Sequence, residues 1–335
     1  MSSTTRPTLP ILGTTAALAI AVVGPSLRSN HRDVGATNPV TVVGLVALVA
    51  IVALPRRSWH VRLLVAAAAG AAIAPFEGPA LAAWLPAALV LAGASAWAKD
   101  WTKVRIGTEG AYPPFNYMSP DGKLVGFDVD IAMALCEHMK VECTLVQQDW
   151  DGMIPALLAK KFDAIVASMS ITDERKQKVE FTKKYYQTPA RFVAKKGTVT
   201  DISKEALAGK KIGVQRATIH DSFLTDNFGD AVEVVRYASQ DEANLDLVSG
   251  RIDMILADSV TLSESLLKTD QGKGFEFVGP AYSDPKWFGY GVGVALRKSD
   301  TDLRDKLNEA IDAIRADGTW DKIAAKYFDF DVYGS

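Results

Sequence analysis

The feature that most constrains the fold is a regular alternation of strand-like and helix-like segments after Lys99. The strand-like segments are short and rich in Val and Ile, whereas the segments between them place apolar residues at helical spacing. These segments, strand first and then alternating, span residues 103–110, 126–139, 143–148, 153–161 and 163–168. Because alternating β and α units form parallel sheets covered by helices, the chain is predicted to have an α/β fold.

The same order of segments recurs at residues 210–215, 219–228, 232–237, 240–250 and 253–258. The two series also align: "KKFDAIVAS" matches "GRIDMILAD", and "VRIGTEG" matches "KKIGVQR", which pairs Glu109 with Gln215 and Ser168 with Asp258. This indicates either two similar lobes or the generic periodicity of α/β proteins. If the lobes face each other, these residues converge on one cleft, because ligands of open α/β sheets bind beyond the carboxyl ends of the strands.

Charge is distributed unevenly along the 335 residues. Residues 1–98 contain six Arg, no Lys and only two acids, whereas the remainder contains 31 basic and 37 acidic residues. A mildly acidic body without a stripe of Lys and Arg argues against binding of nucleic acid, which needs a basic face. The four His residues are scattered without metal-ligand spacing, so we expect neither a metal nor a cofactor.

The first 98 residues carry three long apolar runs that direct the chain to a membrane. The last run has the character of a secretory signal, with Ala96, Trp97 and Ala98 as a processing site before Lys99. Basic residues upstream of it would keep that side cytoplasmic. We therefore expect residues 99–335 to be exported, either released or tethered to the inner membrane through this leader.

Cys136 and Cys143 are the only cysteines in the sequence. Their spacing corresponds to about 10.5 Å along a continuous helix, which is too far for a disulfide. If the helix ends near residues 138–140 and the chain turns into the strand-like "VECTLV", the two sulfurs can meet. An oxidising compartment favours this bridge over the alternative of two buried free thiols.

The stretch "AIVASMSITDERKQ" places Ser168 and Ser170 where a buried strand gives way to a helix, with Arg175 just behind them. Arg in the first turn of a helix is electrostatically unfavourable unless an anion is near. The helix start, its hydroxyls and the planar guanidinium together suit a carboxylate of a ligand. The alternative is that Arg175 pairs with Asp173 or Glu174 on a solvated face.

Asp258 follows four apolar residues at the end of a strand-like segment, so its carboxylate needs a cationic partner or a helix to cap. Arg175 for a carboxylate and Asp258 for an ammonium together describe an α-amino acid as the ligand. Its side chain would then meet Glu109, Tyr112, Trp150 and Asp149, because acids with aromatic rings suit a cation. The pattern therefore favours a basic amino acid.

Residues 101–335 resemble the periplasmic solute-binding proteins for polar amino acids, the group that binds lysine, arginine and ornithine, histidine, or octopine and nopaline. The resemblance rests on the motifs "RIGTEGAYPPFNY", "GFDVDIA", "CEHMKVEC", "WDGMIPAL", "FDAIVASMSITDERKQKVEFTKKYY", "IGVQRATIH", "FGYGVGVALRK" and "ADGTWDKIAAKYF". It implies a two-lobed periplasmic-binding-protein type II fold with crossover strands near residues 187–192 and 288–292.

The resemblance also implies a division of the chain into domains. A hydrophobic, helical leader would span residues 1–98 and precede the binding protein proper. The first lobe would consist of residues 99–189 and 290–335, and the second lobe of residues 190–289.

The resemblance further implies a role for individual residues. Arg175 would bind the α-carboxylate and Asp258 the α-amino group, Ser168 and Ser170 would line the pocket, Tyr112 and Trp150 would stack on the ligand side chain, and Glu109 would meet its far end. The pair Cys136 and Cys143 matches the disulfide of the family. Ala217 departs from the pattern, because relatives often have Gly in this loop, and Ile219 and His220 follow it into the site.

We expect the solute-binding component of an ABC importer, a monomer that captures arginine, lysine, ornithine, histidine or an opine in the periplasm by lobe closure. It would deliver this ligand to a permease in the inner membrane and would not be an enzyme. Two alternatives stay open. One is a periplasmic cyclohexadienyl dehydratase-like enzyme on the same fold, with Glu109 as its acid. The other is a membrane-tethered amino acid sensor domain.

Overall fold

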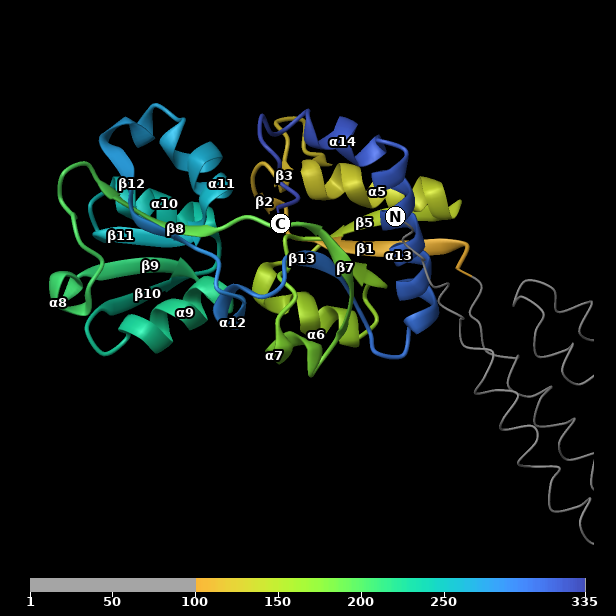
Figure 1. Ribbon diagram of the computed structural model, residues 1–335, viewed down its shortest axis with the longest axis horizontal. Helices are drawn as coiled ribbons and strands as arrows, with labels where there is room; N and C mark the ends of the chain where they lie inside the picture. The colour runs from red at the N-terminus through yellow and green to blue at the C-terminus, as the bar shows by residue number, and fades with distance from the viewer. Residues whose placement is uncertain (1–100, 335) are drawn as a thin grey trace, which may run out of the picture. The chain divides into compact units, whose positions relative to one another are not determined.

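The computed structural model describes residues 101–334, which form two five-stranded sheets with helices packed against them (Figure 1). The apolar runs and the processing site expected within residues 1–98 lie outside this part of the chain. Within residues 101–334, no helix combines the length and the apolar character that crossing a membrane requires.

The first sheet has the strand order β5-β1-β6-β13-β7, and β13 runs antiparallel to both of its neighbours. Its strands are β1 (Lys103–Thr108), β5 (Glu142–Gln147), β6 (Ala164–Ile165), β7 (Glu180–Tyr186) and β13 (Val292–Leu296). Helices α5 (Phe127–Met139), α13 (Thr301–Ala316) and α14 (Thr319–Ala324) pack on one face, and α6 (Met153–Leu158) packs on the other. We refer to these elements as the first lobe.

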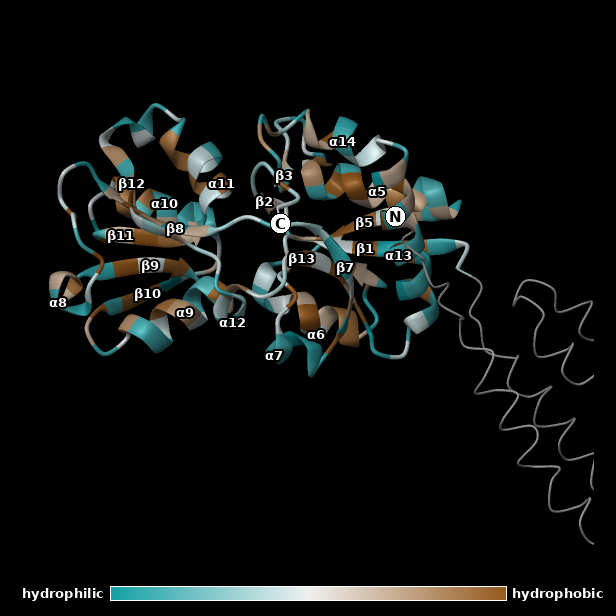
Figure 2. Ribbon diagram, viewed as in Figure 1, coloured by the Kyte–Doolittle hydropathy of each residue, from teal (hydrophilic) through white to brown (hydrophobic). Residues whose placement is uncertain are grey.

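Alternation along the strands builds an apolar core on each face of this sheet. In and after β6, Ala164 and Val166 join the core under α5 and α13, whereas Ile165 and Ala167 join the core under α6. Successive side chains of a strand point to opposite faces, so a continuous apolar run of this kind is buried on both sides. Figure 2 shows hydrophobic residues along the strands and hydrophilic ones on the outer surfaces of the helices.

The second sheet has the order β10-β9-β11-β8-β12, and β8 is the strand that runs antiparallel to both of its neighbours. Its strands are β8 (Ala190–Lys195), β9 (Lys211–Gln215), β10 (Glu233–Tyr237), β11 (Met254–Asp258) and β12 (Phe275–Tyr282). Helix α9 (Ile219–Phe228) packs on one face, whereas α10 (Gln240–Val248) and α11 (Ser259–Leu262) pack on the other. We refer to these elements as the second lobe.

The two sheets correspond strand by strand, with β1, β5 and β6 equivalent to β9, β10 and β11. Their registers correspond as well. Ile106 pairs with Ala164 in the first sheet, and Ile212 pairs with Met254 in the second. The alignment of the two sequence series makes Ile106 equivalent to Ile212 and Ala164 equivalent to Met254, so equivalent residues pair in both sheets.

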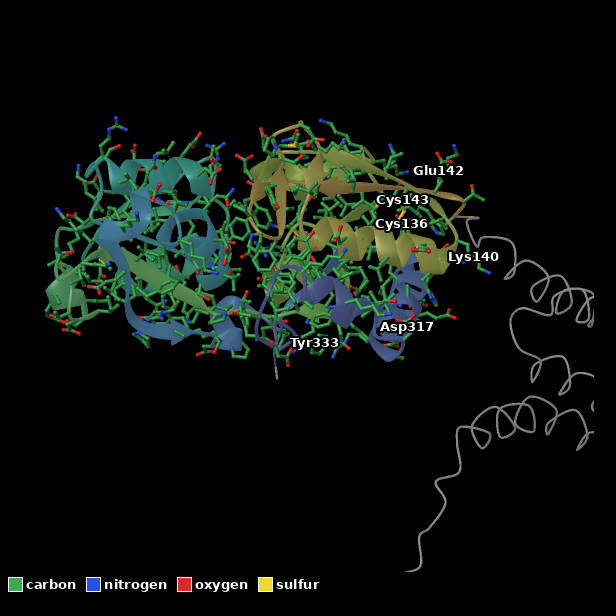
Figure 3. The ribbon with its side chains drawn as sticks, turned by 90° about the horizontal axis from the view of Figure 1, so that it is seen from above. Cys136, Lys140, Glu142, Cys143, Asp317 and Tyr333 are labelled. Carbon is green, nitrogen blue, oxygen red and sulfur yellow. A yellow bond between two sulfur atoms is a disulfide. The ribbon has the colours of Figure 1, made fainter. Side chains whose placement is uncertain are left out.

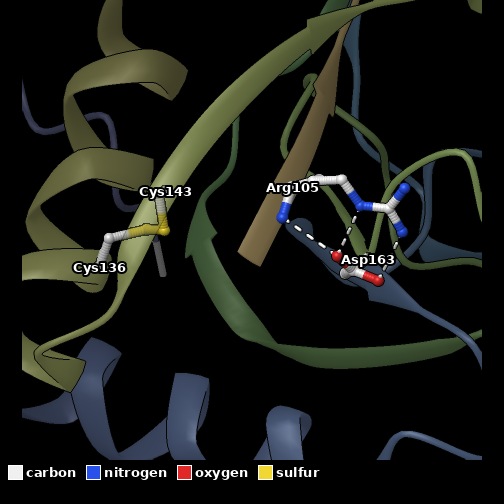
Figure 4. The surroundings of a disulfide bond; sticks show 4 residues. All are labelled: Arg105, Cys136, Cys143 and Asp163. Atoms are coloured by element: carbon white, nitrogen blue, oxygen red, sulfur yellow. Dashed lines mark hydrogen bonds and ion pairs between the residues drawn. A yellow bond between two sulfur atoms is a disulfide. The ribbon is translucent and has the colours of Figure 1, made fainter. Parts of the chain in front are cut away.

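Asp163 and Asp253 make the same contact in their own sheets. Asp163 accepts a hydrogen bond from the backbone N–H of Arg105 at 3.1 Å (Figure 4), and its own N–H donates to the Arg105 carbonyl at 2.8 Å. Asp253 makes both bonds with Lys211, each at 2.8 Å. Generic periodicity does not reproduce an individual side-chain contact, so the recurrence reflects two similar lobes.

The chain passes between the sheets twice (Figure 1). Residues 187–189 join β7 to β8, and residues 283–291, which include α12 (Pro285–Phe288), join β12 to β13. The two-lobed α/β fold with two crossovers that the sequence predicts is therefore confirmed. The residues at which each lobe begins and ends remain predictions.

Helix α5 ends where the two cysteines require it to end. Lys140 adopts the left-handed conformation with φ 56°, and the chain turns there into β5. The turn brings the Cα atoms of Cys136 and Cys143 to 6.2 Å, and their sulfurs form a disulfide (Figures 3 and 4). The predicted bridge is confirmed, and the alternative of two free thiols is wrong.

The remaining elements are short. A small antiparallel sheet is formed by β2 (Ala111–Tyr112), β3 (Asn116–Met118) and β4 (Leu124–Val125). Single helical turns or short helices occur at η1 (Trp150–Gly152), α7 (Asp173–Lys176), α8 (Lys204–Leu207), η2 (Ser263–Leu267) and η3 (Gln271–Gly274). Two of them, η1 and α7, carry Trp150 and Arg175 and therefore matter for the site described next.

Candidate ligand-binding cleft

A cavity lies between the two lobes where their central parallel strands end. Its lining includes Glu109 after β1, Ser168 after β6, Gln215 at the end of β9 and Asp258 at the end of β11. In the internal repeat, Glu109 is equivalent to Gln215, and Ser168 is equivalent to Asp258. They come together because the two sheets direct the carboxyl ends of their parallel strands into one shared space.

The cavity brings together nine of the ten residues predicted for ligand binding: Glu109, Tyr112, Trp150, Ser168, Ser170, Arg175, Ile219, His220 and Asp258. The tenth, Ala217, is not among the lining residues. It contacts the site through its carbonyl oxygen, which accepts a hydrogen bond from Trp150 Nε1 at 3.1 Å. The predicted residues are thus gathered in one place, and the role of each toward a ligand remains a prediction.

Arg175 lies on α7, a four-residue helix with Thr172 as its N-cap. The Thr172 hydroxyl accepts a hydrogen bond from the Arg175 N–H at 3.2 Å, which fixes the start of the helix. Arg175 Nη1 donates to the carbonyl of Ser170 at 3.0 Å, and the guanidinium carbon lies 5.2 Å from the centre of the Trp150 ring. These contacts hold the guanidinium at the wall of the cavity.

Arg175 forms no ion pair within residues 101–334. Its acidic neighbours pair elsewhere, Asp173 with Lys176 at 3.4 Å and Glu174 with Lys178 at 3.6 Å. The solvated pairing that the sequence leaves open is therefore wrong. Burial lowers the pKa of Arg175 to about 10, so the surroundings disfavour its charge. An anion that enters the cavity would supply the missing partner.

Asp258 is both a helix cap and a cavity-lining acid. Its Oδ1 accepts hydrogen bonds from the N–H groups of Val260 at 2.9 Å and Thr261 at 3.1 Å, and the Thr188 hydroxyl donates to Oδ2. Burial raises the pKa of Asp258 to about 6. The capping role that the sequence leaves open is therefore real. A cation in the cavity would favour the ionised carboxylate.

Glu109 is the second acid of the cavity. Its Oε1 accepts a hydrogen bond from Gln215 Nε2 at 2.6 Å. Burial raises the pKa of Glu109 to about 7, and the charges of Asp241, Asp149 and Asp151 raise it further, against the opposing effect of the Gln215 bond. Several acids around one part of the cavity make it a favourable place for a cation.

Two aromatic rings line the same cavity. Tyr112 and Trp150 are each 8% exposed, so little of either ring is open to solvent outside the cleft. The Tyr112 hydroxyl oxygen accepts a hydrogen bond from the Asp258 N–H at 3.4 Å, which links the first lobe to the second. Aromatic faces beside carboxylates attract cationic groups.

Ser168 ends the β6 segment in the left-handed conformation, with φ 54°. Its hydroxyl donates to Oδ2 of Asp128 at 2.9 Å, and this buried carboxylate also accepts from Asn116 Nδ2 at 2.9 Å and from the Tyr185 hydroxyl at 2.7 Å. Burial raises the pKa of Asp128. Ser168 therefore lines the cavity with its hydroxyl already bonded to Asp128, a partner that the sequence did not reveal.

Thr218, Ile219 and His220 line the cavity at the start of α9. Burial, together with the charge of Arg175, lowers the pKa of His220 to about 3. The imidazole is therefore neutral at physiological pH and adds no second positive charge beside Arg175. Its ring centre lies 6.1 Å from that of Phe288.

The two lobes also bond to each other directly around the cavity. Arg216 Nε donates to Asp151 Oδ2 at 2.6 Å, and both side chains are partly exposed. Gln215 and Ala217, the neighbours of Arg216 in sequence, also bond to the first lobe. Gln215 donates to Glu109, and the Ala217 carbonyl accepts from Trp150. The conformation described is therefore one in which the lobes are in contact.

Several lining residues were not predicted from the sequence. They include Tyr186, Thr188, Thr218 and Phe288. Gln215 also lines the cavity, as the alignment of the two sequence series predicts from its equivalence to Glu109. Thr188 and Phe288 lie on the crossovers, where no local pattern marks a binding residue.

Comparison with known proteins agrees with this architecture. Residues 104–330 match the bacterial extracellular solute-binding proteins, family 3. The chain is 58% identical over 233 residues to the L-arginine-binding protein of Pseudomonas aeruginosa, covering 69% of this chain and 90% of that protein. It is 44% identical over 242 residues to the lysine/arginine/ornithine-binding periplasmic protein of Escherichia coli, covering 72% and 93%.

Among solved structures, an ancestral arginine-binding protein bound to arginine matches with a TM-score of 0.63 and 37% identity. The match covers 68% of this chain and 98% of that one. The family match spans both sheets and every residue that lines the cavity. The chain therefore belongs to the bacterial extracellular solute-binding proteins, family 3.

Proposed function

We propose that this protein is the solute-binding component of an ABC amino acid importer and that it binds a basic L-amino acid. The α-carboxylate of the ligand pairs with Arg175 and its α-ammonium with Asp258. The cationic side chain extends along Tyr112 and Trp150 toward Glu109. All five residues line the same cavity, which supports this arrangement.

One observation carries the proposal. The cavity contains a half-buried guanidinium, Arg175, and a buried carboxylate, Asp258, and neither has an ion-pair partner within residues 101–334. Buried charges are stable only when they are paired and hydrogen-bonded. A zwitterion is the simplest ligand that completes both pairs at once.

The nature of the side chain follows from the acids near Glu109. The charges of Asp149, Asp151 and Asp241 raise the pKa of Glu109, and a cationic group beside Glu109 offsets this repulsion. The names of the two curated relatives refer to arginine and to lysine, arginine and ornithine, and the solved structure holds arginine. These relatives support a basic ligand, with arginine first and then lysine, ornithine, histidine or an opine.

We infer that the protein acts in the periplasm as a monomer and delivers its ligand to a permease in the inner membrane. The periplasmic name of the Escherichia coli relative and the disulfide between Cys136 and Cys143 support export. Delivery requires reversible binding and no chemistry on the ligand.

Isothermal titration against a panel of amino acids tests this function. Arginine should bind most tightly, other basic amino acids should follow, and glutamate and leucine should bind weakly or not at all. Arg175→Ala should cost at least about 3 kcal/mol of affinity, because it leaves the ligand carboxylate buried without a partner. Asp258→Asn should weaken binding comparably while the amide oxygen can still cap α11.

Lys176→Ala is the matched control, because Lys176 is the exposed neighbour of Arg175 on the same helix. It should leave the arginine affinity unchanged. Tight binding of glutamate or leucine without binding of arginine would overturn the proposed function.

One observation favours a second function, that of a cyclohexadienyl dehydratase-like enzyme. A pKa of about 7 would let Glu109 donate a proton to a leaving hydroxyl group. The neighbouring acids, in contrast, disfavour a dianionic substrate such as prephenate. Turnover of prephenate that Glu109→Gln abolishes would establish the enzyme, and absence of turnover together with tight arginine binding would support the importer component.

A further inference from the structure

Glu109 and Gln215 end equivalent strands, β1 and β9, and bond to each other across the cleft. Gln215 Nε2 donates to Glu109 Oε1 at 2.6 Å. Both residues line the cavity, and they are 6% and 3% exposed respectively. The bond therefore belongs to the part of the cavity that we assign to the ligand side chain.

The contacts of Gln215 determine the orientation of its amide. Nε2 lies 2.6 Å from the Glu109 carboxylate oxygen and 3.1 Å from the carbonyl oxygen of Ala238. A backbone carbonyl can only accept, so the atom that faces it must be the amide nitrogen rather than the amide oxygen. The two acceptors use both hydrogens of Nε2.

Two acceptor atoms of these residues then have no protein partner within residues 101–334, namely Gln215 Oε1 and Glu109 Oε2. Neither belongs to the side-chain atoms that are fully enclosed without a partner. Each atom therefore keeps some exposed surface, and both residues line the cavity. An acceptor that has no protein donor is open to a donor of the ligand, and a ligand that covers it without donating would leave it unsatisfied, so donors on the ligand side chain are favoured at this place.

Guanidinium and ammonium groups differ in how they present donors. A guanidinium distributes five N–H groups over three nitrogens of a planar fork, whereas an ammonium holds three on one nitrogen. A fork can donate to acceptors on two separate side chains from two positions. A single nitrogen must reach both acceptors from one point.

We propose that Gln215 determines the specificity of the cleft for ligands that end in a guanidinium group over ligands that end in an ammonium group. This inference rests on the proposed function, because it requires a cationic side chain beside Glu109. Gln215 comes from the second lobe and Glu109 from the first, so the pair of acceptors is complete only when the lobes are in contact.

The test compares arginine and lysine affinities of the purified native protein and of Gln215→Leu by isothermal titration. Leu has a similar volume and removes the amide. Arginine affinity should fall at least about tenfold further than lysine affinity, as expected for loss of a hydrogen bond to a charged group. Retained lysine binding reports that the variant is folded, and Gln215→Met serves in the same way if Gln215→Leu does not fold.

Arg216→Gln is the matched control, because it removes the neighbouring cross-cleft bond to Asp151 without touching the acceptors. It should weaken arginine and lysine by the same factor. If the ratio of arginine affinity to lysine affinity in Gln215→Leu stays within about twofold of the wild-type ratio, Gln215 does not determine this specificity. The proposed function would still stand. Wild-type protein that binds neither ligand would refute the proposed function, and this inference with it.

Discussion

Three ionisable residues of the cleft lack an opposite charge from the described part of the chain: Asp258 and Glu109, which are buried, and Arg175, which is half-buried. Burial lowers the pKa of Arg175 to about 10 and raises the pKa values of Asp258 and Glu109 to about 6 and about 7. Each shift favours the neutral form of the group, and an opposite charge placed beside the group reverses it. At the scale of residues, the cleft therefore suits a ligand that carries both signs of charge.

Glu109 should release protons when arginine binds near pH 7. Burial holds its pKa near 7 in the free protein, so roughly half of the molecules carry this proton at that pH, and a neighbouring cation lowers the pKa. Isothermal titration in phosphate and in Tris, which have different ionisation enthalpies, should therefore give different binding enthalpies. Arginine affinity should fall as the pH decreases from 7 toward 5, because the protonated carboxyl must then ionise first.

Glu109→Gln is the control for this prediction, because it keeps an oxygen acceptor for Gln215 and cannot ionise. Glu109→Gln should lower arginine affinity by about 1.5–3 kcal/mol and remove most of the dependence of the binding enthalpy on the buffer. A wild-type enthalpy that is the same in both buffers would contradict the prediction.

Without ligand, the protonation of Glu109 affects folding stability in the opposite direction, because low pH favours the folded protein while it weakens arginine binding. The pKa of Glu109 in the folded protein lies above the ordinary 4.5, so its stabilising contribution is present below pH 4.5 and is lost as pH rises through about 7.

At the scale of elements, two short helices that follow equivalent strands place the charges of the cleft. Helix α7 after β6 and helix α11 after β11 each contain four residues. Each is capped by a side chain, Thr172 in the first lobe and Asp258 in the second. Such caps define the first turn of a helix, so Arg175 and Asp258 are held at defined distances from the strand ends.

The disulfide should stabilise the first lobe without affecting the ligand. It joins α5 to β5 across a sequence separation of seven residues, and neither cysteine lines the cavity. The double variant Cys136→Ala and Cys143→Ala should lower the free energy of unfolding by about 2–3 kcal/mol in urea, as expected for so short a loop. Its arginine affinity should equal that of wild type. A folded double variant that no longer binds arginine would show that the bridge shapes the cleft.

At the scale of the whole molecule, the cleft separates two lobes of equivalent topology that contribute opposite charges. Arg175 belongs to the first lobe and Asp258 to the second, so a zwitterion can contact both only when the lobes are close together. The ion pair between Arg216 and Asp151 joins the same two lobes. A ligand favours the closed form only to the extent that it contacts this form better than the open one.

Small-angle X-ray scattering should therefore report a smaller radius of gyration when arginine is added to the wild-type protein. Arg175→Ala and Asp258→Asn should show no such decrease, because each removes the contact of one lobe with the ligand. Lys176→Ala should behave like wild type. If Arg175→Ala and Asp258→Asn still bind arginine and still contract, the ligand does not bridge these two residues.

Local elements and their ends could be derived from the sequence. Helix α9 spans Ile219–Phe228 as predicted, α5 ends between the two cysteines, and Asp258 caps a helix. The internal repeat also identified the strand ends that meet at the cleft. These features depend on apolar periodicity and on caps, which involve residues only a few positions apart, and the sequence contains this information directly.

The tertiary structure alone decided the partners of the individual side chains. Glu109 meets Gln215, which lies 106 positions away, and the Ser168 hydroxyl meets Asp128, which lies 40 positions away. Segment 163–168 was predicted as a strand, yet β6 contains only Ala164–Ile165, because the chain leaves the sheet toward the left-handed conformation of Ser168. Partner choice, burial and shifted pKa values depend on the packing of both lobes, and the spacing of residues along the chain does not encode that packing.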